Sequence, residues 1–301
     1  MIALPTPTRT DSNIAALSFA TDGRLWVGYF DRGLDILSAD SNSVRHLEDD
    51  HLFCINRIAT DPTRGTMAVA TANGLVLFDR AGTPRQVFGI RDGLINEHVN
   101  DIAWSSGATG NTMALATPAG LTFVSRGGVE SLYAFQGLVN NHVYSIAFSP
   151  DGNLLAGTLG GLSLLQHGAV HQNLTTANSG LDHNWVSAVL SMPAFAGEGT
   201  LIGTYGGGLV ELTNHGQILP LPGAPQTAVI NPNALLATST HILAGSLGQG
   251  LWSYGRSSGR WQQIVAGLPS LNVTAFAARN GELVVGTDNG LVQIPEAQLP
   301  Q

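Results

Sequence analysis

Residues 137–162 read GLVNNHVYSIAFSPDGNLLAGTLGGL, and they contain one complete unit of a pattern that repeats through the chain. A short apolar run, Val143–Phe148, leads into Pro150–Asn153, where Asp-Gly supplies the positive φ that tight hairpins need. A second run, Leu154–Thr158, follows, and the pair Gly161-Leu162 opens a third. The stretch therefore predicts antiparallel strands joined by tight turns, with no helical period.

A Gly-Leu pair opens the third strand run of the unit seven times, at intervals of 40 to 47 residues. A period of this length, filled with short strands, is typical of a β-propeller built from four-stranded blades. We therefore predict an all-β, seven-bladed β-propeller with four-stranded antiparallel blades, as a single domain over residues 1–301. The pairs are Gly33-Leu34, Gly74-Leu75, Gly120-Leu121, Gly161-Leu162, Gly208-Leu209, Gly250-Leu251 and Gly290-Leu291.

The last repeat and the sixth blade depart from the regular unit, which ends in a weaker fourth strand. The last repeat ends at Ile294, so its fourth strand is missing, while an apolar segment, Ile2–Pro5, precedes the first repeat. We expect this N-terminal strand to pair with Gly290–Ile294, which would close the ring and remove an exposed sheet edge. A weak fourth strand is predicted at Ser131–Phe135. The inner strand of the sixth blade, which is the least regular, is placed at Asn233–Ala237.

Composition excludes several classes of protein. The net charge is −8, all 13 basic residues are Arg, and none lies between Arg126 and Arg256, so we expect no nucleic-acid binding. No apolar run is long enough to span a membrane, and the first residues lack the features of a signal peptide. A lone cysteine, Cys54, excludes an intrachain disulfide and is interpreted as a buried small hydrophobe rather than a nucleophile. The chain is compatible with a mature or excised piece of a longer protein.

The repeat unit resembles the two-component regulator propeller repeat. That repeat has the form Gly-Leu, Asn-x-Val, Asp-x-x-Gly-x-Leu-Trp, Gly-Thr, Gly-Leu, and residues 137–162 follow it closely. Asp22–Leu34, with Leu25-Trp26-Val27-Gly28, and Gly180–Val186 match other parts of it. The resemblance implies a ligand-sensing propeller in an extracytoplasmic, periplasmic setting, because such propellers usually form the sensor regions of hybrid histidine kinases. The Gly-His and Trp-Asp signatures of WD40 repeats are missing.

Candidate binding residues fall on one face of the predicted propeller. In antiparallel blades, the loops before the inner strand and between the second and third strands share the mouth of the central channel, a usual place for a ligand site. These loops supply a rim of His, Asn, aromatic and charged side chains. We predict ligand binding there by His98, His142, Asn141, His183, Asn184, Trp185, Tyr29, Arg32, Tyr205 and Asp288.

Each of these side chains also has a purely structural interpretation. His98 and His142 share a repeat position and could form a metal or acid–base pair, or could recur only because the blades descend from one ancestor. Trp185 lies in the same position and favours stacking on a flat ligand or a sugar. The Asn residues are typical turn caps, and Arg32 either clamps a carboxylate or is simply solvated.

Three function classes remain open from the sequence. We favour a non-catalytic sensing or recognition propeller for a small-molecule, carbohydrate or peptide ligand, with no cofactor and no bound metal. A scaffold for a protein partner is the second class, and an exposed apolar patch would favour it. A metal-assisted lyase or hydrolase of the streptogramin-lyase type is the third. No paired carboxylates, Gly-x-Ser-x-Gly motif or phosphate loop supports enzyme activity.

Overall fold

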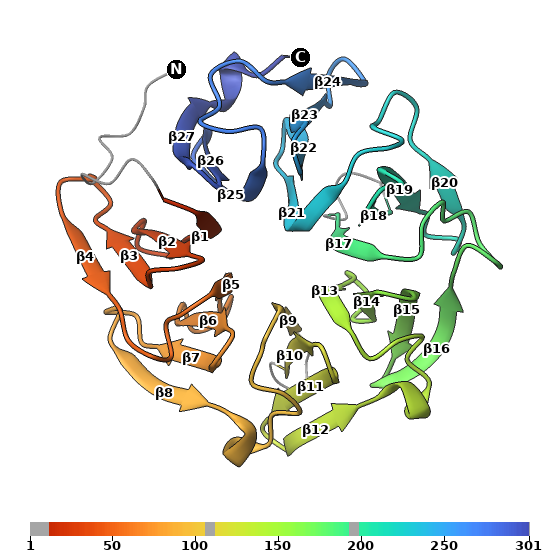
Figure 1. The fold of residues 1–301 in the computed structure, drawn as a ribbon, viewed down its shortest axis with the longest axis horizontal. Helices are drawn as coiled ribbons and strands as arrows, with labels where there is room; N and C mark the ends of the chain where they lie inside the picture. The colour runs from red at the N-terminus through yellow and green to blue at the C-terminus, as the bar shows by residue number, and fades with distance from the viewer. Residues whose placement is uncertain (1–11, 106–111, 193–198, 301) are drawn as a thin grey trace. The chain divides into compact units, whose positions relative to one another are not determined.

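The computed structural model describes residues 12–105, 112–192 and 199–300. Its strands form seven antiparallel sheets, labelled in Figure 1, and the strands of each sheet are neighbours in chain order. The described helices are short 3-10 turns, and none of them is long and apolar enough to cross a membrane. The predicted fold class, an all-β seven-bladed propeller, is confirmed.

The strand bounds follow the repeat. The first three sheets are β1–β4 (Ile14–Phe19, Leu25–Tyr29, Leu34–Leu37, Val44–Leu47), β5–β8 (Ile55–Thr60, Met67–Thr71, Gly74–Phe78, Pro84–Phe88) and β9–β12 (Asp101–Ser105, Thr112–Thr117, Gly120–Ser125, Gly128–Leu132). The next two are β13–β16 (Val143–Phe148, Leu154–Thr158, Gly161–Gln166, Ala169–Leu174) and β17–β20 (Val186–Ser191, Thr200–Thr204, Leu209–Leu212, Ile218–Pro220). The last two are β21–β24 (Ile230–Ala237, His241–Ser246, Gly250–Gly255, Arg260–Ile264) and β25–β27 (Val273–Arg279, Glu282–Thr287, Gly290–Pro295). The 3-10 turns are η1 (Ile90–Asp92), η2 (Ala134–Gln136) and η4 (Glu296–Gln298).

Two predicted strands have different bounds. The fourth strand of the third blade, β12, ends at Leu132 instead of Phe135, because η2 begins at Ala134 and ends in Gly137 at φ 117°. The inner strand of the sixth blade, β21, begins three residues earlier than predicted, at Ile230. Its regular pattern is interrupted by Pro232 and by Asn233 at φ 58°, which explains why the sequence signal is weak there.

The seventh sheet has three strands among the described residues, β25 to β27, whereas each of the other six has four. The segment predicted to complete it, Ile2–Pro5, lies outside the described residues. Its pairing with Gly290–Ile294 therefore stays a prediction.

The Gly-Leu pair has a physical cause in each blade. All seven glycines have positive φ, between 69° and 143°, a region in which side chains are strained. The following leucine is fully buried in six blades, as Leu162 is, and partly buried at Leu291. In six blades a Thr or Ser hydroxyl at the end of the second strand donates to the carbonyl oxygen of this glycine, as Thr158 does to Gly161 at 2.8 Å. The pair thus fixes the turn and anchors the third strand.

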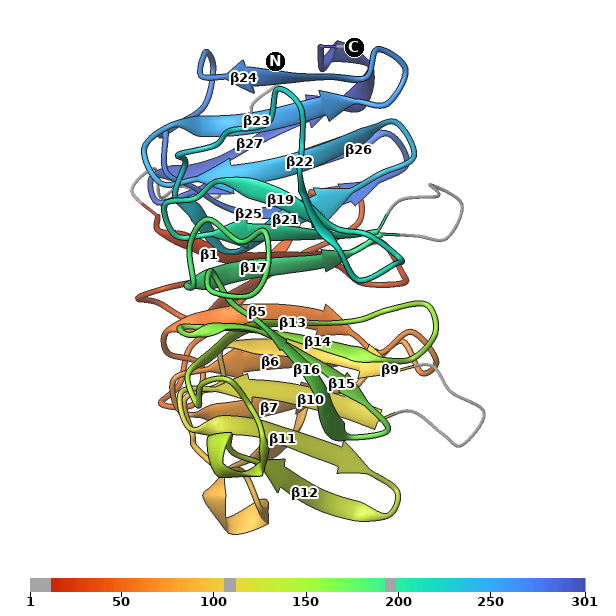
Figure 2. The same cartoon turned by 90° about the vertical axis from the view of Figure 1, so that its right-hand side faces the viewer.

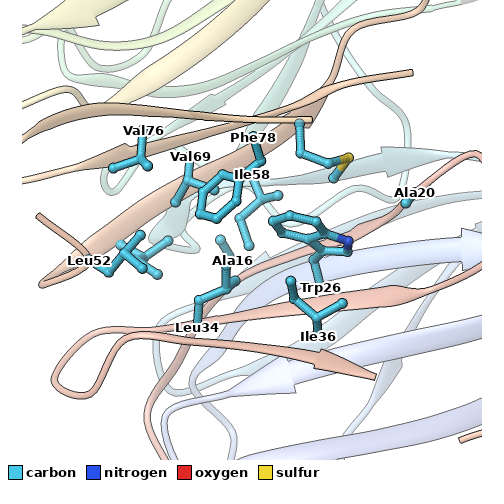
Figure 3. Close-up of a cluster of buried hydrophobic side chains, with 12 residues drawn as sticks. Ala16, Ala20, Trp26, Leu34, Ile36, Leu52, Ile58, Val69, Val76 and Phe78 are labelled. Carbon is cyan, nitrogen blue, oxygen red and sulfur yellow. The ribbon is translucent and has the colours of Figure 1, made fainter. Parts of the chain in front are cut away.

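A second glycine, on the second strand of most blades, permits close packing against the inner strand of the next blade. A Cβ added at Gly157 would lie 2.7 Å from a methyl group of Val186, and one at Gly28 would lie 2.5 Å from Ile55. A larger residue at either glycine would therefore push the second strand of its blade away from the inner strand of the next blade. The cores between sheets are apolar, and Figure 3 shows one of them, in which Trp26 and Phe78 meet edge to face at 5.0 Å.

The chain divides into two compact units. The first unit comprises Met1–Phe88 and Ala234–Gln301, and the second comprises Gly89–Asn233. Each has its own apolar clusters, for example around Trp26 in the first and around Ile146 in the second. The prediction of a single domain is not tested by this division and stays a prediction.

Each sheet has two ends, at which different connections between its strands lie, and Figure 2 shows the strands from the side. Because the four strands alternate in direction, the turns from first to second and from third to fourth strand lie at one end, here called the hairpin end. The connections from second to third strand, and from one blade to the next, lie at the other end, here called the loop end. All the predicted binding residues are at or next to the loop ends of their blades.

Candidate ligand-binding site

Three predicted residues share one structural position in the second unit. His98, His142 and Trp185 each lie directly before the first residue of an inner strand run, at Val99, Val143 and Val186. The backbone N–H of each donates to a side chain two residues earlier: to Asn96 Oδ1 and Asn140 Oδ1 at 2.8 Å, and to His183 Nδ1 at 3.1 Å. This repeated turn fixes the direction in which the three rings leave the backbone.

Four rings at the loop end of the fourth and fifth blades, from His142 to Tyr205, form a continuous row, which we call the aromatic row. His142 stacks on Tyr144 with centroids 4.4 Å apart and planes at 10°, and Tyr144 meets Trp185 at 5.1 Å and 39°. Trp185 stacks in turn on Tyr205 at 4.0 Å and 14°. All four side chains are partly exposed. The row therefore presents a preformed aromatic edge to solvent, of the kind that stacks on flat rings or sugars.

Tyr144 is the member of the row that the sequence analysis missed. It is the second residue of its inner strand run, a position occupied elsewhere by Asn100, Ser187 and Thr274. Those smaller polar side chains each donate to a carbonyl oxygen in the next blade, at 2.5 to 2.7 Å. Tyr144 replaces that bond between blades with ring stacking. Aligning this position across the repeats would have singled it out as the one aromatic residue there.

The electrostatics of the aromatic row keep it uncharged near neutral pH. Burial lowers the pKa of His98, and burial followed by the proximity of His98 lowers the pKa of His142. Burial, and then the proximity of Tyr205, raises the pKa of the Tyr144 hydroxyl. Both imidazoles are therefore mostly neutral at pH 7, because even the unshifted value of 6.5 favours the neutral form there.

A buried polar chain holds the strands beneath the row in register. Asp101 on β9 accepts from the Ser145 hydroxyl at 3.2 Å and from the Ile146 N–H at 2.8 Å, both on β13. Ser145 Oγ accepts in turn from the Val189 N–H on β17 at 3.1 Å. Asp101 and Ser145 are almost fully buried. One carboxylate and one hydroxyl thus tie together the three inner strands that carry His98, His142 and Trp185.

Two predicted Asn residues each accept a hydrogen bond from the backbone of the loop in which they lie. Asn141 Oδ1 accepts from the Ala134 N–H at 2.6 Å, and Asn184 Oδ1 accepts from the Thr176 N–H at 2.8 Å. The turn-capping role expected for Asn is therefore present at both positions, next to the aromatic row.

The first unit holds a different cluster around Tyr29. Tyr29 occupies the position of the turn-fixing Thr or Ser of the other blades, and its hydroxyl donates to Asp35 at 2.6 Å. Asp35 also binds His46 Nδ1 at 2.6 Å, and the Arg32 guanidinium lies 4.1 Å from the Tyr29 ring centroid. Burial, then the bond to Asp35, raises the pKa of Tyr29. With only 3% of its surface exposed, Tyr29 supports Arg32 rather than offering a surface itself.

The remaining predicted residues are separate from these clusters. Asp288, in the first unit, is exposed and accepts from Asn272 Nδ2 at 3.0 Å. Cys54 is buried, and burial raises the pKa of its thiol, which disfavours the reactive thiolate. Within residues 12–105, 112–192 and 199–300, no group of three or more His, Cys, Asp or Glu side chains is arranged to hold a metal ion.

Comparison with solved structures supports the fold and its resemblance to sensor propellers. The extracellular domain of the putative one-component system BT4673 from B. thetaiotaomicron superposes on 97% of this chain and 39% of its own length, with a TM-score of 0.76 and 20% identity. The extracellular domain of the putative hybrid two-component system BT3049 from B. thetaiotaomicron matches 94% of this chain and 40% of its own, with a TM-score of 0.74 and 17% identity.

Propellers of unrelated function have the same fold. A streptogramin B lyase covers 95% of this chain and 94% of its own, with a TM-score of 0.72 and 11% identity. No protein-family model and no curated protein sequence matches the chain. The chain spans about two fifths of the length of the sensor domains it matches. At these identities the likeness establishes the seven-bladed β-propeller fold, and the extracellular domains of two-component sensors are among the propellers that this chain resembles, as the repeat predicted.

Proposed function

We propose that this chain is a non-catalytic recognition propeller that binds a ring-bearing ligand on the aromatic row. The observation that carries the proposal is the continuous stacking of His142, Tyr144, Trp185 and Tyr205, all partly exposed. Loops on a rigid β scaffold are the usual place for binding residues, since they vary without disturbing the core. The likeness to sensor extracellular domains supports a sensing role and, with it, an extracytoplasmic setting.

The chemistry of the row favours an uncharged ligand. His98 and His142 have lowered pKa values and are mostly neutral at pH 7, and no Lys or Arg lies between Arg126 and Arg256. Asp182, on the loop that precedes Trp185, is exposed and lies beside the Gly207 turn. A sugar ring or a neutral aromatic molecule matches this surface better than a polyanion such as a nucleic acid.

The metal-assisted lyase has less support. The likeness to a streptogramin B lyase is one of fold alone, at 11% identity. His98 and His142 are neighbours, but the described residues provide no third His, Cys, Asp or Glu to complete a metal-binding group with them. The His pair is better explained as part of the stacking surface.

The proposal is tested by binding of the purified protein to an array of neutral oligosaccharides and aromatic small molecules. Trp185→Ala should weaken binding of any array ligand about fivefold or more, which corresponds to about 1 kcal/mol for a lost stacking partner. Tyr144→Asn should also weaken binding without lowering the melting temperature, because Asn at this position in the third blade donates to the next blade. Both variants should keep the wild-type fold.

A matched control is Trp261→Ala, on the outer strand β24, where Trp261 contacts Tyr254 at 5.4 Å. This variant also removes a Trp side chain, but at a position far from the aromatic row in sequence. It should therefore leave ligand binding unchanged. Ligands that bind all three variants as tightly as the wild type would contradict the proposal.

A further inference from the structure

The exposed apolar side chains of the described residues are unevenly distributed. Eleven large hydrophobic side chains are 37% to 85% exposed, and three of them, Val44, Val87 and Leu219, lie on fourth strands. None of the eleven lies in a described hairpin-end turn. The other eight lie in loop-end connections: Phe30, Phe53, Ile90, Phe135, Leu159, Leu247, Val265 and Leu271. The loop end therefore carries apolar surface that folding leaves uncovered.

In the first unit, four of these side chains form two matching pairs. One member of each pair follows the second strand of a blade, and the other lies two residues before the inner strand of the next blade. Leu247 and Leu271 form the first pair and are 43% and 41% exposed; Phe30 and Phe53 form the second and are 50% and 52% exposed. The same two positions are thus apolar and exposed at two blade junctions of this unit.

Backbone contacts anchor the loops that carry these side chains, and at one junction they join the loops of both members of a pair. The Gly250 N–H donates to the Leu271 carbonyl at 2.8 Å, which joins the loop of Leu271 to the turn that contains Leu247. At the other junction, a Cβ added at Gly33 would lie 2.3 Å from the Leu47 carbonyl oxygen and 3.1 Å from Glu48 Cα. The Phe53 carbonyl accepts from the Ala72 N–H at 3.4 Å. These anchors hold both junctions in place without covering the apolar side chains.

Exposed acidic residues lie at the same loop end as the four apolar side chains, and we call these residues the acidic fringe. The described loop-end segments of the first unit carry five exposed acidic residues: Asp31, Glu48, Asp49, Asp50 and Asp288. Their single Arg or Lys is Arg32, which lies over the Tyr29 ring and donates to Ser12. The hairpin end of the same unit, by contrast, contains several Arg residues. Arg24 is bound there to Asp22 and to the Ala81 carbonyl. Arg64, Arg80 and Arg256 lie in other hairpin-end turns of this unit. The loop end is therefore apolar and negatively charged.

We propose that the loop end of the first unit, with Leu247, Leu271, Phe30 and Phe53 as anchors, is a docking surface for a protein segment in which large apolar residues alternate with Arg or Lys. Apolar anchors supply binding energy once water is excluded, and a charged fringe of opposite sign steers and orients the partner. The charge complementarity selects a basic segment, and the same acidic fringe disfavours an anionic lipid surface. This surface contains none of the residues of the aromatic row.

The test uses the full-length protein and two fluorescein-labelled synthetic peptides of equal length. One alternates Leu with Arg, and the other alternates Leu with Glu. Fluorescence anisotropy should show binding of the Leu–Arg peptide, which weakens as salt is raised, and no binding of the Leu–Glu peptide. Phe53→Ser combined with Leu271→Ser should weaken binding about tenfold or more, as expected for the loss of two interface anchors. Asp31→Asn with Asp50→Asn should weaken it less and reduce its salt dependence.

The matched control is Val44→Ser combined with Val87→Ser, which removes two exposed apolar side chains from the outer strands β4 and β8. This variant should bind the Leu–Arg peptide like the wild type. Equal binding of both peptides, or equal loss in the control and loop variants, would overturn the proposal. So would binding to anionic vesicles, or a dimer in sedimentation velocity that the loop variant abolishes, because the occupant would then be a membrane or a second copy of the chain.

Discussion

The loop ends of the two units use the same backbone positions for different surfaces. In the second unit, the residue directly before the inner strand run is His142 or Trp185, and its ring stacks on the rings beside it. In the first unit, the corresponding residues are Cys54 and Asn272, which are buried and hydrogen-bonded respectively. There the large apolar side chains lie one position earlier, at Phe53 and Leu271, and stand exposed.

The difference shows what a repeat fold leaves free. Turn glycines, Thr hydroxyls and buried leucines recur in both units, because they fix the backbone of each blade. Many loop-end side chains are not needed to fix the backbone of the blade. One unit can therefore have a neutral aromatic row at its loop end, and the other an apolar surface with an acidic fringe. We propose that each of these two surfaces recognises a different partner, and the following experiments test the differences between the two units.

The largest effect is expected at the sheet that distinguishes the first unit. The second unit contains complete four-stranded sheets, whereas β25 to β27 form three strands among the described residues. We predict that deleting residues 1–8 lowers the melting temperature by many degrees, because the segment Ile2–Pro5 is expected to cover the edge of this sheet. Thermal unfolding followed by circular dichroism measures the change. A melting curve identical to that of the full chain would show that the edge needs no such cover.

A smaller effect is expected from the buried polar chain under the aromatic row of the second unit, in which Asp101 and Ser145 connect three inner strands. Ser145→Ala removes the partner of the Val189 N–H and one partner of Asp101, so buried polar groups are left unpaired. We expect a loss of roughly 1–3 kcal/mol in the free energy of unfolding, measured by urea denaturation. Any ligand of the aromatic row should also bind more weakly.

The control for this variant is Ser131→Ala on the outer strand β12, which should change the free energy of unfolding by less than about 0.5 kcal/mol. Equal free energies of unfolding for the two serine variants would show that the polar chain does not stabilise the strands under the row.

The smallest effect concerns histidines whose pKa values shift in opposite directions in the two units. Partial burial lowers the pKa of His46, but its bonds to Asp35 and Glu48 outweigh this, so the pKa is raised above 6.5. His98 and His142 have pKa values lowered below 6.5 by burial. NMR titration of the imidazole C–H signals should therefore place His46 above, and His98 and His142 below, the value of an unfolded chain.

The consequences for stability have opposite signs. The contribution of His46 is complete below about pH 6.5 and is lost as the pH rises through its folded pKa. For His98 and His142, the unfolded chain binds protons more readily, so stability is lost as the pH falls below about 6.5. His46→Asn should thus reduce stability mainly in acid, and His142→Asn should relieve part of the acid destabilisation. Equal pKa values for all three histidines would remove this distinction between the units.

How much of the molecule the sequence predicted depends on whether a feature is local. The Gly-Leu period predicted seven blades because each pair requires positive φ followed by a buried side chain, and both requirements act within a few residues. The Asp-Gly hairpins are local in the same way, with Gly152 at φ 84° and Gly23 at φ 93°. Asn140 and Asn96 cap turns two residues away, which their residue type already indicates.

Tertiary structure decided which side chains meet. His142, Trp185 and Tyr205 were predicted as separate rim residues, but they form one row only because Tyr144, from an inner strand, bridges His142 and Trp185. Tyr29, one of the predicted binding residues, is buried, and its hydroxyl donates to Asp35 on the next strand. Asp101 and Ser145 are 44 residues apart and bond through packing of adjacent sheets. A repeat pattern determines the path of the backbone from local φ preferences, whereas contacts between blades depend on side-chain shape and polarity across sheets that the sequence separates by a whole repeat.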